Sequence, residues 1–174
     1  NIAKGGVYMN YRLAEPENLS KLLEMYTDIY KRMNESGVIL WNEHYPYDAL
    51  PGDIQAKRLW LLCSGSEIAA AFALDEYSEI SGITWHEPDA PAAVIMRLGV
   101  STRFIRQGLG KKCVEFAGKL AAERGWKYLR LLVAECNKPA EEFYVHCGFA
   151  RAEGIHIENM GNGDILGCGY EIRT

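Results

Sequence analysis

The second half of this chain alternates apolar runs of strand length with amphipathic stretches of helix length, and this alternation constrains the fold most. Strand-like runs cover residues 93–100 and 128–135. Stretches with apolar side chains at three- and four-residue steps follow them, over residues 109–121 and 140–147. Helices that alternate with strands must pack on the sheet that those strands form, so we expect a single sheet of the α/β or α+β class.

The first half supplies further strands and one long helix. An amphipathic helix is expected after Pro16, and a turn at residues 64–67 predicts a hairpin. A short helix could run from Asp53 to Lys57. The stretch Gly161-Asn162-Gly163-Asp164 predicts a turn between the two closing strands. The remaining strands are expected near residues 8–13, 59–63, 68–74, 149–158 and 165–172, and aromatic-bearing irregular segments at 37–52 and 76–91.

Composition narrows the class of protein. With 174 residues, of which 48% are hydrophobic and 24% charged, the chain has the make-up of one compact domain. Residues 1–8 precede Met9, a candidate natural start, and are interpreted as an added remnant or a flexible N-terminus, which leaves 9–174 as the single domain. No apolar run is long enough to span a bilayer, so a membrane role is not expected.

Cysteine usage and charge give the expected compartment and partners. Five cysteines without a C-x-x-C pair argue against a disulfide framework and favour a cytoplasmic location. A net charge of -4 offers no general attraction for nucleic acid. A cationic or amine-bearing partner fits this charge better, although a mildly acidic balance is also ordinary for soluble proteins.

A glycine-bearing loop joins the strand ending at Val100 to the next helix. Gly108 and Gly110 open that helix, and glycines permit the close approach of a ligand to the backbone. The free N–H groups and partial positive charge of a helix N-terminus bind anions. Arg103, Arg106, Lys111 and Lys112 add full charges nearby. A tight turn that merely needs glycines is the alternative.

Two familiar phosphate motifs do not fit this loop. A Walker loop requires a glycine five residues before Gly110, where Ile105 stands, and Ser or Thr after Lys111, where Lys112 stands. A dinucleotide fingerprint requires a third glycine, where Cys113 stands. By its own residues the loop therefore predicts an anion site of another kind.

The stretch from Ile105 to Gly110 resembles motif A of the GNAT superfamily of N-acetyltransferases, usually written Gln/Arg-x-x-Gly-x-Gly/Ala. In that family the loop wraps the pyrophosphate of CoA. One departure is that Ile105 occupies the leading Gln/Arg position. Since the family uses mainly backbone amides here, Ile105 is expected to weaken cofactor binding without abolishing it.

A second and more specific resemblance lies between Asn137 and Phe149. This stretch matches the superfamily signature Asn-x-x-Ala-x-x-x-Tyr-x-x-x-Gly-Phe at every fixed position. The resemblance implies a GNAT fold, with a single mixed, mainly antiparallel sheet of six to seven strands flanked by about four helices. It also implies acetyl-CoA as cosubstrate, no metal, and a possible homodimer.

The resemblance assigns roles to individual residues. Tyr144 matches the family's general acid, which protonates the departing CoA thiolate; the alternative is a tyrosine packed in the core. Asn137 matches the residue that hydrogen-bonds the cofactor arm; the alternative is a cap for the following helix. The strand that polarises the acetyl carbonyl carries no acidic residue, so Glu135 is the first substitute for the missing base; it could equally be a solvated strand-end residue. The predicted cofactor-binding residues are Leu98, Gly99, Val100, Ile105, Arg106, Gln107, Gly108, Leu109, Gly110, Lys111, Asn137, Ala140, Phe143 and Tyr144.

The two irregular segments border the acceptor side of the cleft in this family. Their aromatic and imidazole side chains could form a substrate wall or could be packing anchors. Acidic neighbours such as Glu43, Asp48, Asp53, Glu76 and Glu79 could attract a cationic amine or simply be solvated. The candidates for the substrate wall are Trp41, Tyr45, Tyr77, Trp85 and His86.

The sequence therefore predicts direct transfer of an acetyl group from acetyl-CoA to a primary amine, most simply that of a small molecule, in a ternary complex. Two alternatives remain open. The first is a non-catalytic acyl-CoA-binding sensor, which would fit the lack of an acidic residue in the strand at 93–100 and the presence of Ile105. A protein or peptide N-acetyltransferase would require an open groove for its substrate.

Overall fold

The computed structural model describes residues 2–4, 7–42, 44–159 and 164–174. Gly161, Asn162 and Gly163 of the predicted turn lie outside these residues, as does Glu43, whereas the last residue of that turn, Asp164, begins a strand. Two compact parts are present and are described separately. The first part comprises Asn1–Leu74 and Arg97–Cys113, and the second comprises Asp75–Met96 and Val114–Thr174.

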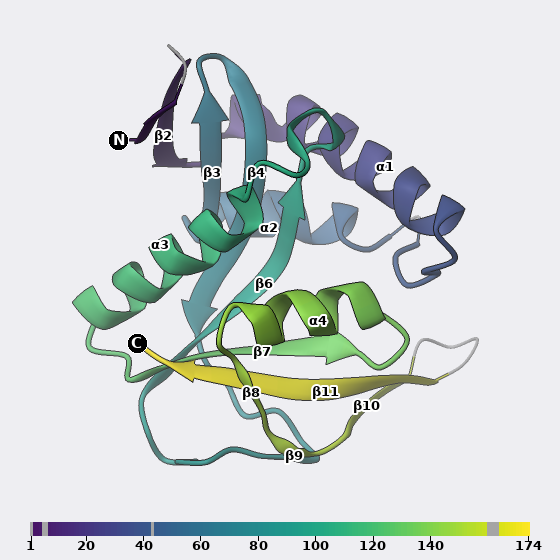
Figure 1. Cartoon of the computed structure of the whole chain (residues 1–174), viewed down its shortest axis with the longest axis vertical. Helices are drawn as coiled ribbons and strands as arrows, with labels where there is room; N and C mark the ends of the chain where they lie inside the picture. Colours follow the sequence, from purple (N-terminus) through teal and green to yellow (C-terminus); the bar gives the residue numbers. More distant parts are fainter. Residues whose placement is uncertain (1, 5–6, 43, 160–163) are drawn as a thin grey trace. The chain divides into compact units, whose positions relative to one another are not determined.

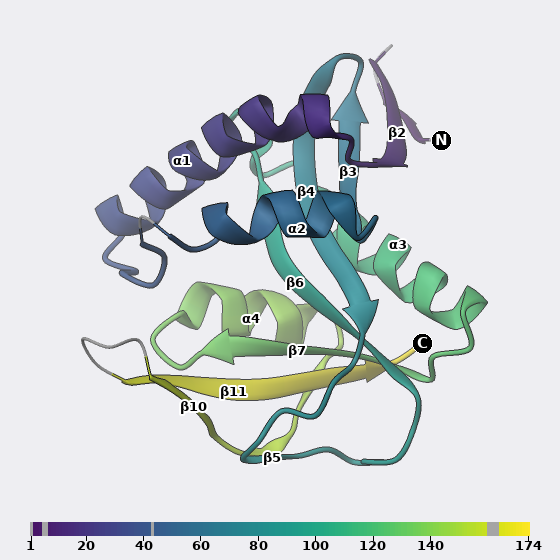
Figure 2. The same ribbon diagram turned by 180° about the vertical axis from the view of Figure 1, so that it is seen from behind.

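Antiparallel strands form the sheet of the first part, in the order β1, β2, β3 and β4. Helices α1 and α2 lie over one face of β3 and β4 (Figure 2). Leu22, Tyr26 and Leu50 point from these helices into the core and are fully buried. The elements are β1 (Ile2–Lys4), β2 (Val7–Leu13), α1 (Leu19–Glu35), α2 (Leu50–Gln55), β3 (Leu59–Ser64) and β4 (Glu67–Glu76).

The hairpin between β3 and β4 follows the sequence closely. Both strands read as continuous apolar runs, and seven consecutive residues from Ile68 to Leu74 are buried. Gly65 takes a left-handed φ of 60° in the turn, which glycine does at little cost. The short helix expected from Asp53 instead begins at Leu50, because Pro51 fits the first turn of a helix, where its missing N–H has no acceptor to lose.

The sheet of the second part contains β6, β7, β11 and β10. β6 pairs with β7 in parallel, whereas β11 pairs antiparallel with β7 and β10. Helix α4 lies across β7 and β11 (Figure 1). The elements are β6 (Ala92–Val100), α3 (Leu109–Glu123), β7 (Tyr128–Ala134), α4 (Lys138–His146), β8 (Ala150–Arg151), β10 (His156–Asn159) and β11 (Asp164–Arg173).

A buried guanidinium holds the loop before β6 against this sheet. Arg130 is fully buried on β7, and its Nε donates to the Glu171 carboxylate at 3.1 Å. Its Nη2 donates to the carbonyl of Glu87 at 2.7 Å. Three aromatic rings lie within 4.7 to 5.6 Å of the guanidinium carbon, a cation–π arrangement. We call Arg130, Glu171 and the rings of Tyr77, Trp85 and Tyr128 the Arg130 cluster.

The expected fold class is confirmed: the sheet is mixed and mainly antiparallel, with four α-helices in the described residues. It has nine strands there, not the six to seven expected, because β1 is added and one expected strand is divided. The closing strand expected over residues 149–158 is instead divided into β8, β9 (Glu153–Gly154) and β10, and β9 pairs with β5 (Ile83–Thr84). Gly154 explains the division, because it has a φ of 87° and its missing Cβ would lie 2.2 Å from the carbonyl of Gly82. No helix in the described part of the chain is both long and apolar enough to cross a membrane.

Two glycine substitutions should have opposite effects on stability. A Cβ at Gly169 of β11 would lie 2.7 Å from Ile83 Cγ2 and 3.0 Å from Trp85, so Gly169→Ala should lower the free energy of unfolding by about 1–3 kcal/mol. Gly118 lies inside α3 with no atom within 4 Å of its Cβ position, so Gly118→Ala should raise it by about 0.5–1 kcal/mol. Urea unfolding measures both; equal stability of the two variants would contradict the packing described here.

Candidate active site

The predicted phosphate loop begins where β6 ends. The N–H of Ser101 donates to the carbonyl of Ala69 at 2.9 Å and ties the loop to β4. A 3-10 turn, Thr102–Phe104, follows. Arg106 and Gly108 then adopt left-handed φ angles of 60° and 71°. Turn conformations of this kind gather successive backbone N–H groups into concavities that bind anions.

Helix α3 starts directly after this loop and adds further donors. The N–H groups of a helical first turn have no acceptor within the helix, and the helix dipole makes this end partially positive. The first turn of α3 carries no acidic side chain. A Cβ built on Gly108 would meet no heavy atom within 4 Å, so the backbone there is open to a ligand. These features suit a phosphate group.

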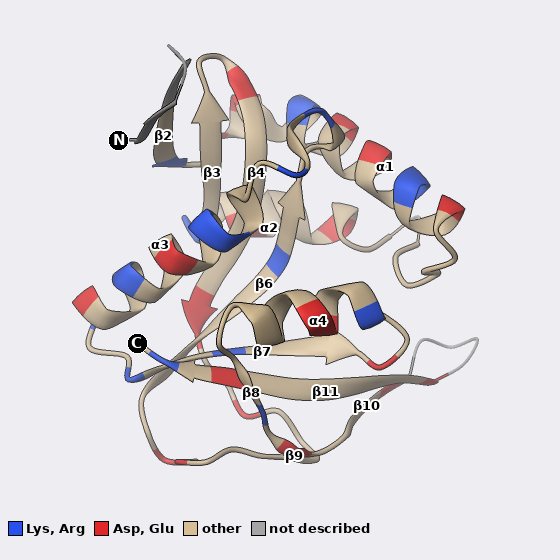
Figure 3. Cartoon of the chain, in the orientation of Figure 1, with Lys and Arg blue, Asp and Glu red and all other residues tan. Residues whose placement is uncertain are grey.

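Side chains in the loop divide into exposed and anchoring residues. Arg106, Gln107 and Lys111 are exposed, whereas Leu109 is only 2% exposed and fixes the start of α3 in the core. Ile105 is half-buried. Basic residues are visible along the loop and in the first turn of α3 (Figure 3). The loop therefore offers both backbone donors and exposed positive charge.

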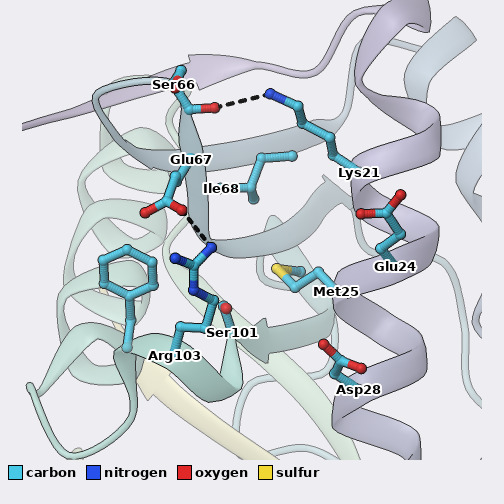
Figure 4. Close-up of a pocket in the computed structure, with 10 residues that line it drawn as sticks. Lys21, Glu24, Met25, Asp28, Ser66, Glu67, Ile68, Ser101 and Arg103 are labelled. Atoms are coloured by element: carbon cyan, nitrogen blue, oxygen red, sulfur yellow. Dashed lines mark hydrogen bonds and ion pairs between the residues drawn. The ribbon is translucent and has the colours of Figure 1, made fainter.

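A hollow of about 380 Å³ is lined by residues of α1, of the turn between β3 and β4, and of the segment Ser101–Phe104 (Figure 4). Arg103, which was expected to add positive charge near the phosphate loop, forms an ion pair with Glu67 in this hollow. Lys21 donates to the carbonyl of Ser66 at 3.2 Å. Apart from the beginning of the loop, the hollow contains none of the predicted site residues.

Strand β6, which was expected to lie beside the thioester, contains an irregular backbone position. Its register with β7 covers Ala92–Val94 in the described residues, although β6 continues to Val100 and β7 to Ala134. Arg97 then takes a left-handed φ of 54° inside the strand, which L-residues with a Cβ rarely do. Gly99 is buried against Tyr26 and Ile29 of α1. The segment with the predicted acetyl-binding backbone, Leu98–Val100, is thus the part of β6 that follows this kink.

Helix α4 carries the second predicted group of residues. The side chain of Asn137 accepts a hydrogen bond from the N–H of Ala140 at 3.3 Å, so Asn137 caps the helix. The ring of Tyr144 is half-buried between those of Phe143 and Phe149, with centroids 5.0 and 5.5 Å away. Glu135 is exposed at the end of β7.

None of the side chains of α4 is fully buried. The hydroxyl of Tyr170 on β11 donates to the carboxylate of Glu141 at 2.8 Å, and Lys138 donates to the same carboxylate at 2.8 Å. The bond from Lys138, and then that from Tyr170, lowers the pKa of Glu141. Burial and the bond to Glu141 raise the pKa of Tyr170 to about 12. Glu141 therefore stays ionised and accepts both bonds at neutral pH.

The five candidates for a substrate wall fall into two groups. In the first part, Trp41 packs on Tyr26 and Tyr45 with ring centroids 5.7 and 6.2 Å away, and Tyr26 in turn contacts Gly99. In the second part, Tyr77 and Trp85 belong to the Arg130 cluster; Trp85 is 4% exposed and its Nε1 donates to the Tyr77 hydroxyl at 2.7 Å. Trp85 is thus the packing anchor that the sequence allowed as the alternative.

The contacts of two further residues bear on their expected roles. The side chain of His86 is exposed while its backbone N–H donates to Glu171 at 2.7 Å, so this residue also fastens the loop to the Arg130 cluster. Asp53 is fully buried and paired with Arg58 and Arg97, so it cannot attract an amine from solvent. Sequence patterns gave no sign of these two ion pairs, since the position of a charged residue in the chain does not indicate its partner in the fold.

Comparison with known proteins defines the class. The model of the acetyltransferase (GNAT) family matches residues 21–149, a range that includes both predicted motifs. The chain therefore belongs to the GNAT acetyltransferase family. A search of curated protein sequences gave no significant match.

Solved structures share the fold at low sequence identity. A GNAT-family acetyltransferase from Streptococcus agalactiae superposes with a TM-score of 0.79 at 18% identity, over 97% of this chain and 99% of that one. NAA60 of Arabidopsis thaliana, solved with acetyl-CoA, gives 0.70 at 15% identity over 96% and 100%. The PaiA N-acetyltransferase of Thermoplasma acidophilum, solved with coenzyme A, gives 0.68 at 17% identity over 96% and 99%.

The two tryptophans should respond differently to truncation. Trp85→Ala removes a buried ring from the Arg130 cluster and should lower the free energy of unfolding by about 3–5 kcal/mol. Trp41 is only half-buried, so Trp41→Ala should cost clearly less stability. Thermal and urea unfolding measure both losses. An equal loss in the two variants would contradict the division of the aromatic residues made above.

Proposed function

We propose that this protein transfers the acetyl group of acetyl-CoA to a primary amine of a small molecule by direct attack in a ternary complex. The observation that carries the proposal is the open backbone of the Arg106–Gly108 turn, which precedes a helix, α3, without acidic side chains in its first turn. Membership of the GNAT family supports acetyl-CoA as the ligand of this anion site. Two structural neighbours, solved with acetyl-CoA and coenzyme A, agree with it.

In this proposal the pyrophosphate of CoA lies on the loop from Ile105 to Lys111. The backbone N–H groups of the loop and of the first turn of α3 donate to its oxygens, and Arg106 and Lys111 add positive charge. Asn137 already uses its side-chain oxygen to cap α4, so its amide N–H₂ is the part proposed to contact the cofactor arm.

The chemistry follows from the thioester. The neutral amine attacks the acetyl carbonyl and forms a tetrahedral oxyanion, which backbone N–H groups of Leu98–Val100 stabilise. Collapse of this intermediate breaks the carbon–sulfur bond and expels the CoA thiolate. The Tyr144 hydroxyl donates its proton to the sulfur, while the amine nitrogen loses a proton to solvent or to Glu135, which is exposed at the end of β7.

The acceptor is proposed to be a small amine on the basis of the aromatic group in the first part. Trp41 and Tyr45 present partly exposed rings next to Tyr26, and such faces attract alkylammonium groups. A peptide acceptor is the competing possibility, since one fold neighbour is an Escherichia coli ribosomal-protein-S18-alanine N-acetyltransferase with a TM-score of 0.65 at 17% identity. Thiol release from acetyl-CoA, measured with polyamines, amino acids, aminoglycosides and peptides, decides between these acceptors. A protein that binds acetyl-CoA and releases no thiol with any of them would be the acyl-CoA sensor.

Gly108→Glu should remove affinity for CoA by placing a carboxylate at the proposed pyrophosphate position. Gly37 is a matched control, because it has a similar φ of 83° and also has no atom within 4 Å of its Cβ position. Gly37→Glu should therefore impose the same backbone strain and leave CoA affinity unchanged. Calorimetric titration with CoA measures both variants. Retained affinity in Gly108→Glu would contradict the assignment of the loop.

Tyr144→Phe should lower the rate of acetyl transfer by about 10²–10⁴-fold, as expected for loss of a general acid, and change CoA affinity little. Tyr47→Phe, which alters a half-buried tyrosine of the first part, serves as the control and should turn over normally. Turnover and its pH profile are measured with the best amine from the panel. Unchanged turnover across the pH range would remove Tyr144 from the mechanism.

A further inference from the structure

The kink in β6 is held from two sides by side chains. The hydroxyl of Tyr26 on α1 donates to the carbonyl oxygen of Arg97 at 2.6 Å. On α2, Asp53 Oδ2 accepts from Nε and Nη2 of Arg97 at 2.7 and 2.6 Å. Its other oxygen accepts from Arg58 at 2.7 Å. Both the main chain and the side chain of the left-handed residue are therefore fixed.

The bond from Tyr26 also fixes the next N–H group. The carbonyl of Arg97 and the N–H of Leu98 belong to one planar peptide unit, in which they point in opposite directions. Because the carbonyl points at Tyr26, the Leu98 N–H points away from α1. Of the three N–H groups in Leu98–Val100, that of Leu98 is thus the one whose direction is set by a side chain.

We propose that Tyr26 and Asp53 are positioning residues that hold the kink at Arg97 so that the N–H of Leu98 is aimed at the acetyl carbonyl. This inference rests on the proposed function and adds to it a single named oxyanion donor. The donor is also strengthened, since a hydrogen bond to a peptide carbonyl polarises the whole peptide unit. The chain of bonds runs from the Tyr26 hydroxyl through the Arg97–Leu98 peptide to the developing oxyanion.

The surroundings of Tyr26 suit this role. Its side chain is fully buried, and burial raises the pKa of its hydroxyl far above the usual range, so the group remains a donor at every working pH. Gly99 leaves room for the ring of Tyr26, because a Cβ at position 99 would lie 2.9 Å from Tyr26 Cε1. Arg97 is 8% exposed in its side chain, and Asp53 is the carboxylate that pairs with it.

Infrared difference spectroscopy of bound acetyl-CoA, labelled with ¹³C at the acetyl carbonyl, tests the proposal without an acceptor. A hydrogen bond from Leu98 lowers the carbonyl stretching frequency. In Tyr26→Phe the band should move to higher frequency than in the wild type, while the affinity for acetyl-CoA stays within about twofold because the phosphate loop is intact. With an active amine, kcat should fall about tenfold, less than for outright loss of an oxyanion donor.

Tyr128→Phe is the matched control, because it also removes a hydroxyl bond of a buried tyrosine, at 2.7 Å to Glu87, in the second part. It should leave the band and kcat unchanged. If Tyr26→Phe does not fold, 3-fluorotyrosine at position 26 replaces it; as a stronger donor of nearly the same size it should lower the frequency further.

The outcomes separate this inference from the proposed function. Suppose that the wild-type protein binds acetyl-CoA and transfers its acetyl group. An unchanged band in Tyr26→Phe, or in the 3-fluorotyrosine protein where that replaces it, would then overturn the role of Tyr26 alone. A wild-type protein that does not bind acetyl-CoA would overturn both. A parallel loss of rate and band shift in Tyr128→Phe would show that general loosening, and not the bond to Arg97, is responsible.

Discussion

The carboxylate of Asp53 is the constraint on which the first part of this protein most depends. It is fully buried, so its charge is tolerable only because Arg58 and Arg97 donate to both of its oxygens. Removing one partner of such a buried pair typically costs about 3–5 kcal/mol, because the remaining charge stays buried. The ion pair between Asp53 and Arg97 also joins α2 to β6, and Arg97 is the residue of that strand with a left-handed backbone. Stability and the course of the proposed acetyl-binding strand therefore depend on the same carboxylate.

The Arg130 cluster plays the corresponding structural role in the second part. There the charge is balanced by Glu171 across the β7–β11 pair and by the faces of three aromatic rings. It holds a long loop, residues 77–91, against the sheet. Trp85 is buried in this packing, whereas the side chain of His86 is exposed and that of Tyr77 half-buried. Tyr77, His86, Trp41 and Tyr45 therefore remain candidates from the sequence for contact with the acceptor.

Periodicity and glycine placement were sufficient to predict most of the fold. The boundaries of α3 and α4 follow from Gly108, Gly125 and Gly148, whose left-handed conformations the sequence could anticipate at helix ends. The division of the strand expected at 149–158 was missed, since it depends on a contact between Gly154 and Gly82, residues far apart in the chain. The turn that precedes α3 could be predicted because it is local. The bond from Tyr26 to Arg97 could not, because it joins residues 71 positions apart and an inward helical tyrosine looks like any core residue.

The partial burial of α4 has a consequence for dynamics. None of the side chains of α4 is fully buried, and the bond from the Tyr170 hydroxyl on β11 to Glu141 joins the helix to the sheet. We expect such an element to open at a lower free energy than the buried strands of the sheet. Its amide protons should then exchange with solvent sooner than those of β7 and β11 beneath it. If a cofactor contacts Asn137 and Tyr144, part of the binding free energy is used to order this helix. Slower amide exchange along α4 in the presence of the cofactor would then show that the cofactor contacts the helix.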